Sequence, residues 1–507
     1  MIDGSARYFW DIHNTYADQQ AVVINQTPDC VISGVDLSQR IDEIKGWLLS
    51  TAVDVKEETD SGHRRKKQLG CILANNQLQD IEFYLAALQI NDAVMILDGK
   101  MNPLLLRGIV EQYRPDWITG SCIIDETAVV LKALSYEESR QDTLWFLKGS
   151  FGEEIKEVTK EITDSTINDQ LAVLLSTSGT TGNPKMVRLS KKNLQANAQA
   201  IATYLNLYPQ ERAITSLPMS YSYGLSVINS HLLAGGTLLL TDESVMSKAF
   251  WQLFREGEAT SLAGVPYMYQ MLHRLRLSKM ELPSLRTLTQ AGGRLPEDLA
   301  RYFGELAEER GWRFFVMYGQ TEATARMSYL PPEMLLSKLN SIGVAIPGGR
   351  FEIDDQTEEL IYYGANVMLG YAENRSDLSK GDECQGRLAT GDIAISDAEG
   401  YYYITGRLKR IIKLFGLRIN LDDLEQQIQR EFHINIASTG NDEQMNVWLE
   451  RQQEAQQEVD RLLLQIKQWI GQRYQLYHTA YTVKAIEKIP VTNNGKIDYI
   501  TLLEMIE

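Results

Sequence analysis

The order of apolar and polar positions predicts a large α/β region in the first part of the chain. Through about residue 370, short apolar runs alternate with longer amphipathic segments, the pattern of a mainly parallel sheet covered by helices. The run Leu171–Leu175 predicts a strand buried on both faces. Further on, Ser190 predicts a helix N-cap, and apolar residues follow at helical spacing: Leu194, Ala198, Ile201 and Leu205.

The pattern changes in the last third of the chain. Between about 350 and 405, short β-rich pieces with turns predict an antiparallel subdomain, with a hairpin joining 393–395 to 401–404. After it, a helix at 424–428, strands near 434–436 and 447–449, and a long helix through 455–470 predict a small α+β domain. We therefore expect an α/β fold in which mostly parallel sheets with covering helices and a small β-rich subdomain fill 1–405. A hinge at 406–409 and a small mobile α+β domain at 410–507 complete the prediction.

Composition and charge narrow the classes of function. The chain has 507 residues, 44% of them hydrophobic, and a formal net charge of −17. Phosphate backbones require clustered Lys and Arg, so this charge argues against nucleic-acid or anionic-membrane binding. No run of about 20 apolar residues predicts a membrane span, and no secretory signal is evident near Met1. The four scattered cysteines are typical of a reducing compartment, so we expect a cytoplasmic protein without a zinc site.

A polar loop directly after the predicted strand at 171–175 is typical of a phosphate-binding site. Glycines let backbone N–H groups converge on an anion, hydroxyls add donors, and a lysine supplies a positive charge. The pattern is not the Walker motif, because Lys185 follows Pro184 rather than a glycine. A polar surface turn is the alternative interpretation, which the position after a buried strand disfavours. The loop reads Ser176-Thr177-Ser178-Gly179-Thr180-Thr181-Gly182-Asn183-Pro184-Lys185.

This loop and five further segments resemble, in the same order along the chain, the adenylate-forming enzymes. That superfamily includes acyl- and aryl-CoA synthetases, peptide-synthetase adenylation domains and firefly luciferase. The further segments are Ala291-Gly292-Gly293-Arg294, Tyr318-Gly319-Gln320-Thr321-Glu322, Thr390-Gly391-Asp392, Gly406-Arg407 and Pro490-Val491-Thr492-Asn493-Asn494-Gly495-Lys496. The six motifs extend from residue 176 to residue 496, so the resemblance covers most of the chain.

The resemblance implies that ATP and Mg²⁺ bind to the N-terminal domain and that the C-terminal domain is a lid carrying a catalytic lysine. Lys496, Lys185 and Glu322 are the implied catalytic residues, and Glu322 and Thr180 are the implied metal ligands. Joining two anions requires such charge neutralisation. The residues implied to bind ATP or AMP are Thr177, Ser178, Gly179, Thr180, Thr181, Gly182, Lys185, Gly292, Gly293, Arg294, Tyr318, Gly319, Gln320, Thr321, Glu322, Asp392, Arg407 and Lys496.

Departures from the family pattern indicate which class of carboxylic acid the protein activates. Amino-acid-activating relatives have an aspartate where this chain has Gly224, so a fatty or aryl acid is favoured over an α-amino acid. Tyr221 stands where related CoA ligases have a histidine. Alternatively, Tyr221 and Tyr223 are packing aromatics with satisfied hydroxyl groups. The resemblance gives these acyl-binding candidates: Tyr221, Tyr223, Gly224, Val265, Pro266, Tyr267, Ala291 and Gly292.

A second half-reaction is implied by the segment after the hinge. Lys409 is the implied hinge residue, and Lys413 and Gly416 resemble the lining of a pantetheine tunnel, although Gly416 is alternatively a simple turn glycine. The few residues after Lys496 leave no room for a fused carrier domain. The acyl acceptor is therefore expected to be coenzyme A or a separate carrier protein.

Together these features predict an AMP-forming acid–thiol ligase. The carboxylic acid would be activated as an acyl-adenylate with release of pyrophosphate, and a pantetheine thiol would then take the acyl group and release AMP. Two alternatives are an adenylating enzyme with an amine acceptor and a catalytically silent nucleotide-binding protein. The presence of Lys185, Glu322, Asp392, Arg407 and Lys496 disfavours the silent protein.

Overall fold

The computed structural model divides the chain into two compact units. It describes residues 8–16, 20–50, 65–121, 125–134, 136–141, 144–149, 166–176, 185–414, 417–441, 443–451, 456–474, 476–491 and 497–505. Unit 1 comprises residues 1–350 and 362–388, and unit 2 comprises 351–361 and 389–507. The predicted hinge at 406–409 lies within unit 2 and stays a prediction.

A mixed sheet with a parallel centre forms one half of unit 1. Its central strands β1, β11, β10, β12, β13 and β14 are parallel, and antiparallel strands β2, β15 and β16 flank them. In sheet order the strands are β16 (Val344–Ala345), β15 (Ser328–Leu330), β14 (Arg313–Tyr318), β13 (Thr287–Gln290), β12 (Ser261–Gly264), β10 (Arg212–Ile214), β11 (Thr237–Leu240), β1 (Ala21–Asn25) and β2 (Val31–Ser33).

A second mixed sheet forms the other half of unit 1. Strands β8, β4, β3 and β5 are parallel, and β9, β19, β7 and β6 extend the two edges in antiparallel fashion. In sheet order the strands are β19 (Gly370–Ala372), β9 (Met186–Ser190), β8 (Leu171–Ser176), β4 (Ala93–Asp98), β3 (Leu69–Ala74), β5 (Trp117–Gly120), β7 (Leu144–Gly149) and β6 (Tyr136–Gln141).

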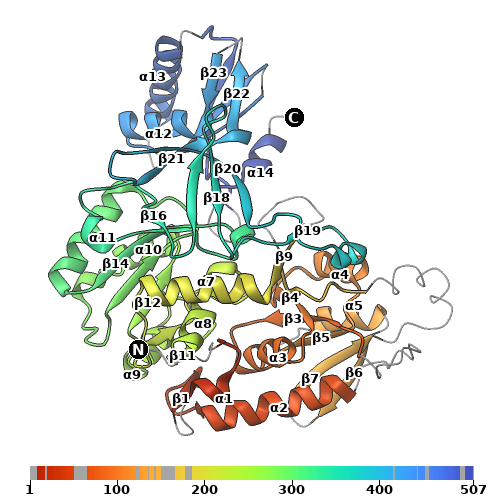
Figure 1. Cartoon of the computed structure of the whole chain (residues 1–507). Coiled ribbons are helices and arrows are strands. Elements are labelled where there is room, and N and C mark those ends of the chain that lie inside the picture. The colour runs from red at the N-terminus through yellow and green to blue at the C-terminus, as the bar shows by residue number, and fades with distance from the viewer. Residues whose placement is uncertain are drawn as a thin grey trace. The chain divides into compact units, whose positions relative to one another are not determined.

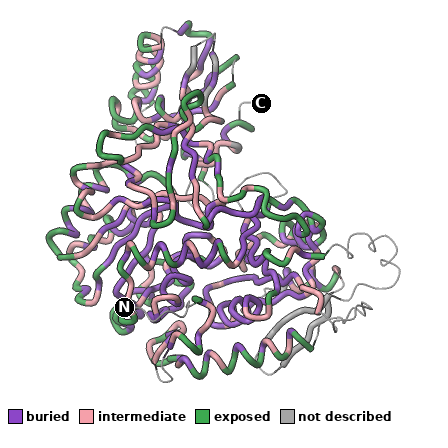
Figure 2. Tube along the Cα trace, in the orientation of Figure 1, coloured by how far each residue is buried: buried purple, intermediate pink, exposed green. Residues whose placement is uncertain are grey.

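Helices lie between these two sheets and on their outer faces (Figure 1). Inside, α8 (Ser222–Leu233) packs on β10 and β11, α7 (Lys191–Tyr204) packs on β8 and β9, and the two helices contact each other. One hydrophobic core cluster joins both sheets to this inner layer of helices. In Figure 2 the buried residues of the chain are purple. The other α-helices that the structure describes in unit 1 are α1 (Ile12–Thr15), α2 (Gly34–Ser50), α3 (Leu78–Gln89), α4 (Pro103–Tyr113), α5 (Asp125–Ala133), α9 (Lys248–Glu256), α10 (Pro266–Arg274) and α11 (Glu297–Arg310).

Unit 2 contains three smaller sheets and three helices among its described residues. A four-stranded sheet has the order β17 (Arg350–Ile353), β18 (Glu359–Tyr363), β20 (Arg387–Ser396) and β21 (Tyr402–Arg407). A hairpin follows, formed by β22 (Ile411–Leu414) and β23 (Leu417–Asn420). The last sheet, β24 (Ile436–Gly440), β25 (Met445–Glu450) and β26 (Tyr481–Ile486), accompanies α12 (Leu421–Phe432), α13 (Gln456–Tyr474) and α14 (Tyr499–Glu504).

The patterns that predicted individual elements are confirmed. Strand β8 is buried along Leu171–Leu175, and α7 begins after Ser190, whose hydroxyl oxygen accepts a hydrogen bond from the Asn193 N–H at 3.1 Å. The predicted hairpin is β20 with β21. The predicted α/β fold class is likewise confirmed. None of the helices that the structure describes is long and apolar enough to cross a membrane.

Gly70 offers a test of the packing of β3 against β5. A Cβ atom at Gly70 would lie 2.0 Å from the Trp117 ring, whereas Gly108 in α4 has open space around it. We expect Gly70→Ala to lower the stability of unit 1 by about 1–3 kcal/mol through overpacking. Gly108→Ala should instead raise it by about 0.5–1 kcal/mol, because alanine favours a helix interior. Calorimetric melting of both variants checks this, and a neutral Gly70→Ala would contradict the packing.

Candidate active site

Three neighbouring parallel strands of unit 1 end at one edge of their sheet. Strand β12 ends at Gly264, β13 at Gln290 and β14 at Tyr318, and the three are paired in register. Ligands of α/β sheets bind outside the carboxyl ends of such strands. Two of the sequence motifs, 291–294 and 318–322, begin at these ends. The sheet therefore brings together segments that lie about 25 residues apart in the sequence.

Just beyond the end of β13, the backbone packs closely against neighbouring side chains. Gly292 has φ +83°, and a Cβ there would lie 2.5 Å from the Tyr221 hydroxyl oxygen and 3.1 Å from Cγ1 of Val265. At Gly293 a Cβ would lie 3.2 Å from the Pro266 ring. Four acyl-binding candidates, namely Tyr221, Val265, Pro266 and Gly292, thus lie around one bend of the chain.

Two further glycines are required by close backbone contact. A Cβ at Gly319 would lie 1.8 Å from the carbonyl oxygen of Ala325, and one at Gly224 would lie 2.2 Å from that of Pro218. An aspartate cannot occupy position 224 unless the Pro218 carbonyl moves. The structure therefore gives a packing reason for the glycine that the sequence singled out.

Tyr221 and Tyr223 have different environments. Tyr223 is buried and donates a hydrogen bond from its hydroxyl to Thr289 Oγ1 at 2.8 Å, which is the packing that the alternative interpretation predicts. Tyr221 packs against the same core, and burial raises the pKa of its hydroxyl to about 12. Among the described residues, the Tyr221 hydroxyl has no hydrogen-bond partner. Ala291 is buried, and Tyr267 is exposed.

The carboxylate of Glu322 is held by a tyrosine from the second sheet. Tyr371 in β19 donates a hydrogen bond from its hydroxyl to Glu322 Oε1 at 2.9 Å. Burial raises the pKa of Tyr371, and the negative charge of Glu322 raises it further. The phenol therefore stays protonated and keeps donating. One carboxylate oxygen is positioned in this way, while Oε2 stays available to another ligand.

The turn that carries Glu322 is fixed by a segment that sequence reasoning missed. Met368 N donates to the Glu322 carbonyl at 2.8 Å. The buried Asn366 donates from Nδ2 to the carbonyls of Ala323 at 2.9 Å and Arg326 at 3.1 Å. The flanking glycines, Gly364 and Gly370, are the only hint in the sequence, since they suggest a tight path for the chain.

The predicted phosphate loop leaves and rejoins the second sheet next to Tyr371. Ser176 and Met186 are partners across β8 and β9, and Met186 also pairs with Ala372 of β19. Lys185 Nζ lies 2.5 Å from Glu373 Oε1 in an exposed ion pair. Both ends of the loop are thus close to the tyrosine that holds Glu322. The predicted loop residues Thr177, Ser178, Gly179, Thr180, Thr181 and Gly182 lie outside the described residues.

The N-terminus of α8 faces the same region. Ser222, its first residue, has its hydroxyl oxygen 3.2 Å from Thr321 Oγ1, next to Glu322. Helix N-termini favour anions, because the first N–H groups lack partners within the helix. In the neighbouring motifs, Gln320 Nε2 donates to the Tyr318 hydroxyl at 3.3 Å, and Arg294 donates to Asn340 Oδ1 at 3.0 Å.

In unit 2 the strand pair β20 and β21 brings Asp392 and Arg407 together. They are partners in the register, and Arg407 Nε donates to Asp392 Oδ1 at 3.1 Å. The Asp392 side chain is 4% exposed and that of Arg407 is 61% exposed. Two motifs that lie 15 residues apart thus form one polar pair, and their roles in nucleotide binding stay predictions.

The residues on either side of the segment that carries the predicted catalytic lysine form an isolated β-bridge. Val491 and Ile497 pair in antiparallel fashion, and beyond them the Tyr499 hydroxyl donates to Glu425 Oε2 at 3.0 Å. Lys496 itself and Gly416 lie outside the described residues. The backbone at Lys409 belongs to a 3₁₀ turn, Leu408–Arg410, and that at Lys413 belongs to β22.

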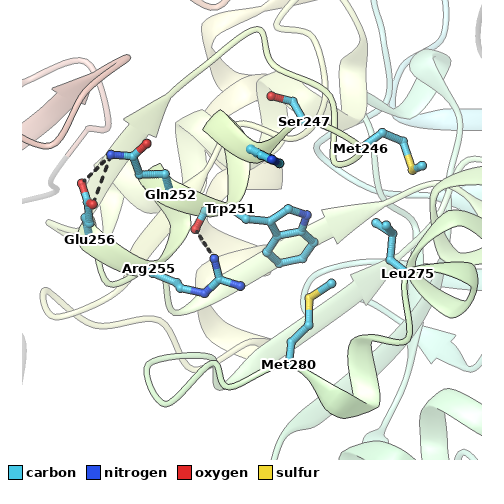
Figure 3. Close-up of a pocket in the computed structure, with 9 residues that line it drawn as sticks. Met246, Ser247, Trp251, Gln252, Arg255, Glu256, Leu275 and Met280 are labelled. Atoms are coloured by element: carbon cyan, nitrogen blue, oxygen red, sulfur yellow. Dashed lines mark hydrogen bonds between the residues drawn. The ribbon is translucent and has the colours of Figure 1, made fainter.

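A cavity of about 600 Å³ lies elsewhere in unit 1, beside α9. Figure 3 shows Trp251, Met280 and Leu275 around it. Arg255 donates there to the carbonyl oxygen of Trp251 at 3.4 Å. None of the predicted site residues lines this cavity, so it is not the candidate site.

Comparisons with known proteins found a matching family, relatives of similar sequence and solved structures of similar fold. The AMP-binding enzyme family matches residues 60–372. The chain is 25% identical over 444 residues to 2-succinylbenzoate–CoA ligase of Bacillus pumilus, covering 86% of this chain and 85% of that protein. It is 28% identical over 358 residues to D-alanine–D-alanyl carrier protein ligase of Bacillus licheniformis, covering 65% and 70%. O-succinylbenzoate coenzyme A synthetase of Bacillus subtilis, solved with ATP and a magnesium ion, has a similar fold, with a TM-score of 0.72, 19% identity and coverage of 97% and 98%.

The contact between Gly292 and Tyr221 gives a stability prediction. We expect Gly292→Ala to destabilise unit 1 by about 1–3 kcal/mol, through the clash and the positive φ. Adding Tyr221→Phe removes the nearest atom, so the double variant should recover at least about 0.5 kcal/mol relative to additivity. Thermal melting of the two single variants and the double variant measures this coupling, and strict additivity would contradict the contact.

Proposed function

This chain belongs to the AMP-binding enzyme family, and we propose that it is an ATP-dependent acid–thiol ligase. A carboxylate oxygen of the acid attacks the α-phosphorus of ATP, the bond to the β-phosphate oxygen breaks, and an acyl-adenylate and pyrophosphate form. The sulfur of a pantetheine thiol then attacks the acyl carbon and loses its proton. The bond from that carbon to AMP breaks, which gives a thioester and AMP.

The convergence of two motifs and the N-terminus of α8 on one sheet edge supports this proposal. The Gly292 bend, the Glu322 turn and the N-terminus of α8 meet there, and Tyr371 connects them with the ends of the loop 177–184. Joining two anions needs local positive charge and N–H donors. We assign Lys185 and the loop hydroxyls to the leaving pyrophosphate, and Lys496 to the α-phosphate and the carboxylate.

The donor set fits Mg²⁺ held chiefly by phosphate oxygens. The searched part of the chain contains no group of three or more His, Cys, Asp or Glu that could hold a metal ion. Mg²⁺ typically takes one or two protein ligands together with substrate phosphates, and Glu322 Oε2 suits this arrangement. We propose Glu322 and Thr180 as these ligands. Bound there, Mg²⁺ would neutralise charge on the phosphates.

The substrate is proposed to be a carboxylic acid without an α-ammonium group. Tyr221 and Val265 lie next to the Gly292 bend, and position 224 is a glycine, which has no carboxylate to hold an ammonium group. One relative is named for an aryl acid and coenzyme A, and another for D-alanine and a carrier protein. Either coenzyme A or a separate carrier protein could supply the thiol that accepts the acyl group. We propose that the hinge at Lys409 moves residues 410–507 between the two half-reactions.

The first functional prediction concerns Lys496. We expect Lys496→Ala to lower the rate of acyl-adenylate formation by at least about 10²-fold, the usual scale for one preorganised charged group. Pyrophosphate release in the presence of an acid measures it. Lys488→Ala, which changes an exposed lysine of the same unit, is the matched control and should retain activity. A normal rate for Lys496→Ala would contradict the assignment.

The second functional prediction separates the half-reactions at Gly416. We expect Gly416→Trp to leave acid-dependent pyrophosphate release unchanged and to block thioester formation, because a bulky side chain would close the tunnel that the pantetheine arm needs. Gly416→Ala is the control and should support both steps. Equal loss of both steps in Gly416→Trp would refute the tunnel assignment. Nucleotide hydrolysis that never depends on an added acid would refute the ligase itself.

A further inference from the structure

Arg188 is a buried arginine whose hydrogen bonds go mainly to backbone carbonyl groups. It lies in β9 and is 0% exposed. Its guanidinium group pairs with Glu383, whose side chain is half exposed. Nε donates to the carbonyl oxygen of Tyr371 at 3.0 Å, and Nη2 donates to that of Leu369 at 3.3 Å. A buried charge is costly unless it is paired and hydrogen-bonded, and Arg188 meets both conditions.

The other terminal nitrogen of Arg188 holds the loop that follows β19. Nη1 donates to the carbonyl oxygen of Lys380 and, at 3.2 Å, to that of Gly381. An arginine has five N–H donors in a fixed plane, and the acceptors around Arg188 are four backbone carbonyls and one carboxylate. The side chain therefore ties β9, β19 and the loop at 380–383 together. A lysine, with all its donors on one nitrogen, cannot bind the same set.

Gly370 leaves the space that this guanidinium group occupies. It is the partner of Arg188 in the antiparallel register of β19 and β9. A Cβ atom at Gly370 would lie 2.4 Å from Glu383 Oε2 and 2.7 Å from Arg188 Nη2. Successive side chains of a strand point to opposite faces, so Tyr371 extends from the face opposite to the one that holds Arg188. Arg188 therefore acts on Tyr371 through the backbone alone.

The segment that Arg188 binds holds Glu322 at two points. Met368 N donates to the Glu322 carbonyl oxygen at 2.8 Å, and the Tyr371 hydroxyl donates to Glu322 Oε1 at 2.9 Å. The two β19-side carbonyls that Arg188 binds belong to the same segment, 368–371. This segment therefore fixes the main chain and the carboxylate of Glu322 relative to each other.

We propose that Arg188 and Tyr371 are positioning residues for the metal ligand Glu322. The inference rests on the proposed ligase function, in which Glu322 binds Mg²⁺. Arg188 fixes the backbone of β19, and that backbone holds the Tyr371 hydroxyl against one carboxylate oxygen, so that Glu322 Oε2 keeps a fixed direction. Partners that orient a metal ligand are worth about 10- to 100-fold in metal affinity. The role requires no contact of either side chain with the metal or the nucleotide.

The test measures how strongly Mg²⁺ tightens nucleotide binding to the full chain. The nucleotide is α,β-methylene-ATP, whose α–β linkage cannot be cleaved, and titration calorimetry gives its dissociation constant in EDTA and in Mg²⁺. The constant in EDTA divided by the constant in Mg²⁺ is the Mg²⁺ ratio, which reports the coupling of metal and nucleotide on the protein. We expect Tyr371→Phe to lower the Mg²⁺ ratio about 10-fold and to leave the constant in EDTA unchanged.

Variants at Arg188 test the contribution of the backbone. Arg188→Lys keeps the charge but loses most of the carbonyl contacts, so the Mg²⁺ ratio should again fall about 10-fold. Combined with Tyr371→Phe, the two losses should not add, because they act on the same carboxylate. Gly370→Ala displaces the guanidinium group without removing it. It should also lower the Mg²⁺ ratio, which keeps the test available if Arg188→Lys does not fold.

Two substitutions elsewhere in unit 1 are matched controls. Tyr302→Phe removes another partly buried hydroxyl group, which donates to Ser278 Oγ at 3.0 Å. Arg375→Lys changes another buried arginine, which pairs with Asp116 at 3.0 Å. Both should retain the full Mg²⁺ ratio, even where the melting temperature falls.

Glu322→Gln separates the inference from the proposed function. It should lower the Mg²⁺ ratio at least as far as Tyr371→Phe, and the double variant should show no further loss. A normal ratio in Tyr371→Phe or in folded Arg188→Lys, or weaker binding to the same extent in EDTA, would overturn the inference. Acid-dependent pyrophosphate release by the unaltered chain would leave the ligase standing in that case. A normal ratio in Glu322→Gln would refute the metal ligand and the inference together.

Discussion

The candidate site depends on the close approach of backbone segments where β12, β13 and β14 end. Gly224, Gly292 and Gly319 occupy positions where a Cβ would overlap a carbonyl or a hydroxyl. Replacing any of them would push α8, the strand end or the Glu322 turn away from its neighbour. The small residues therefore keep the walls close together, and the neighbouring side chains Tyr221 and Glu322 take their positions from that backbone.

The second sheet of unit 1 also holds the Glu322 turn in place. Asn366 lies in the short connection that leads into β19, and Tyr371 lies in β19 itself. Both hold the Glu322 turn through side-chain donors, Tyr371 to Glu322 Oε1 and Asn366 to the backbone carbonyl of Ala323. Because β19 pairs with β9, which begins just after the predicted phosphate loop, one strand contacts both the Glu322 turn and β9. The Glu322 turn and the strand that follows the predicted phosphate loop are in this way tied to a common support.

The sequence predicted those parts of the site in which a local pattern and a function coincide. Strand β8 and the Ser190 cap follow from periodicity and capping. The partnership of Tyr371 with Glu322 spans 49 residues and depends on how two sheets meet, which no local pattern encodes. Equally, nothing in the sequence indicated that Arg326 is buried and forms no ion pair among the described residues. An arginine shows its charge in the sequence, but whether a carboxylate reaches it is decided by packing.

The chain has a net charge of −17, so carboxylates outnumber cationic side chains. The cationic side chains differ in how exposed they are and in whether they are paired. Lys185 and Arg407 are exposed and already contact Glu373 and Asp392. An anionic ligand must therefore compete with a carboxylate in each case, which favours highly charged ligands such as a triphosphate. Arg326 is buried, and it forms no ion pair with any residue that the structure describes.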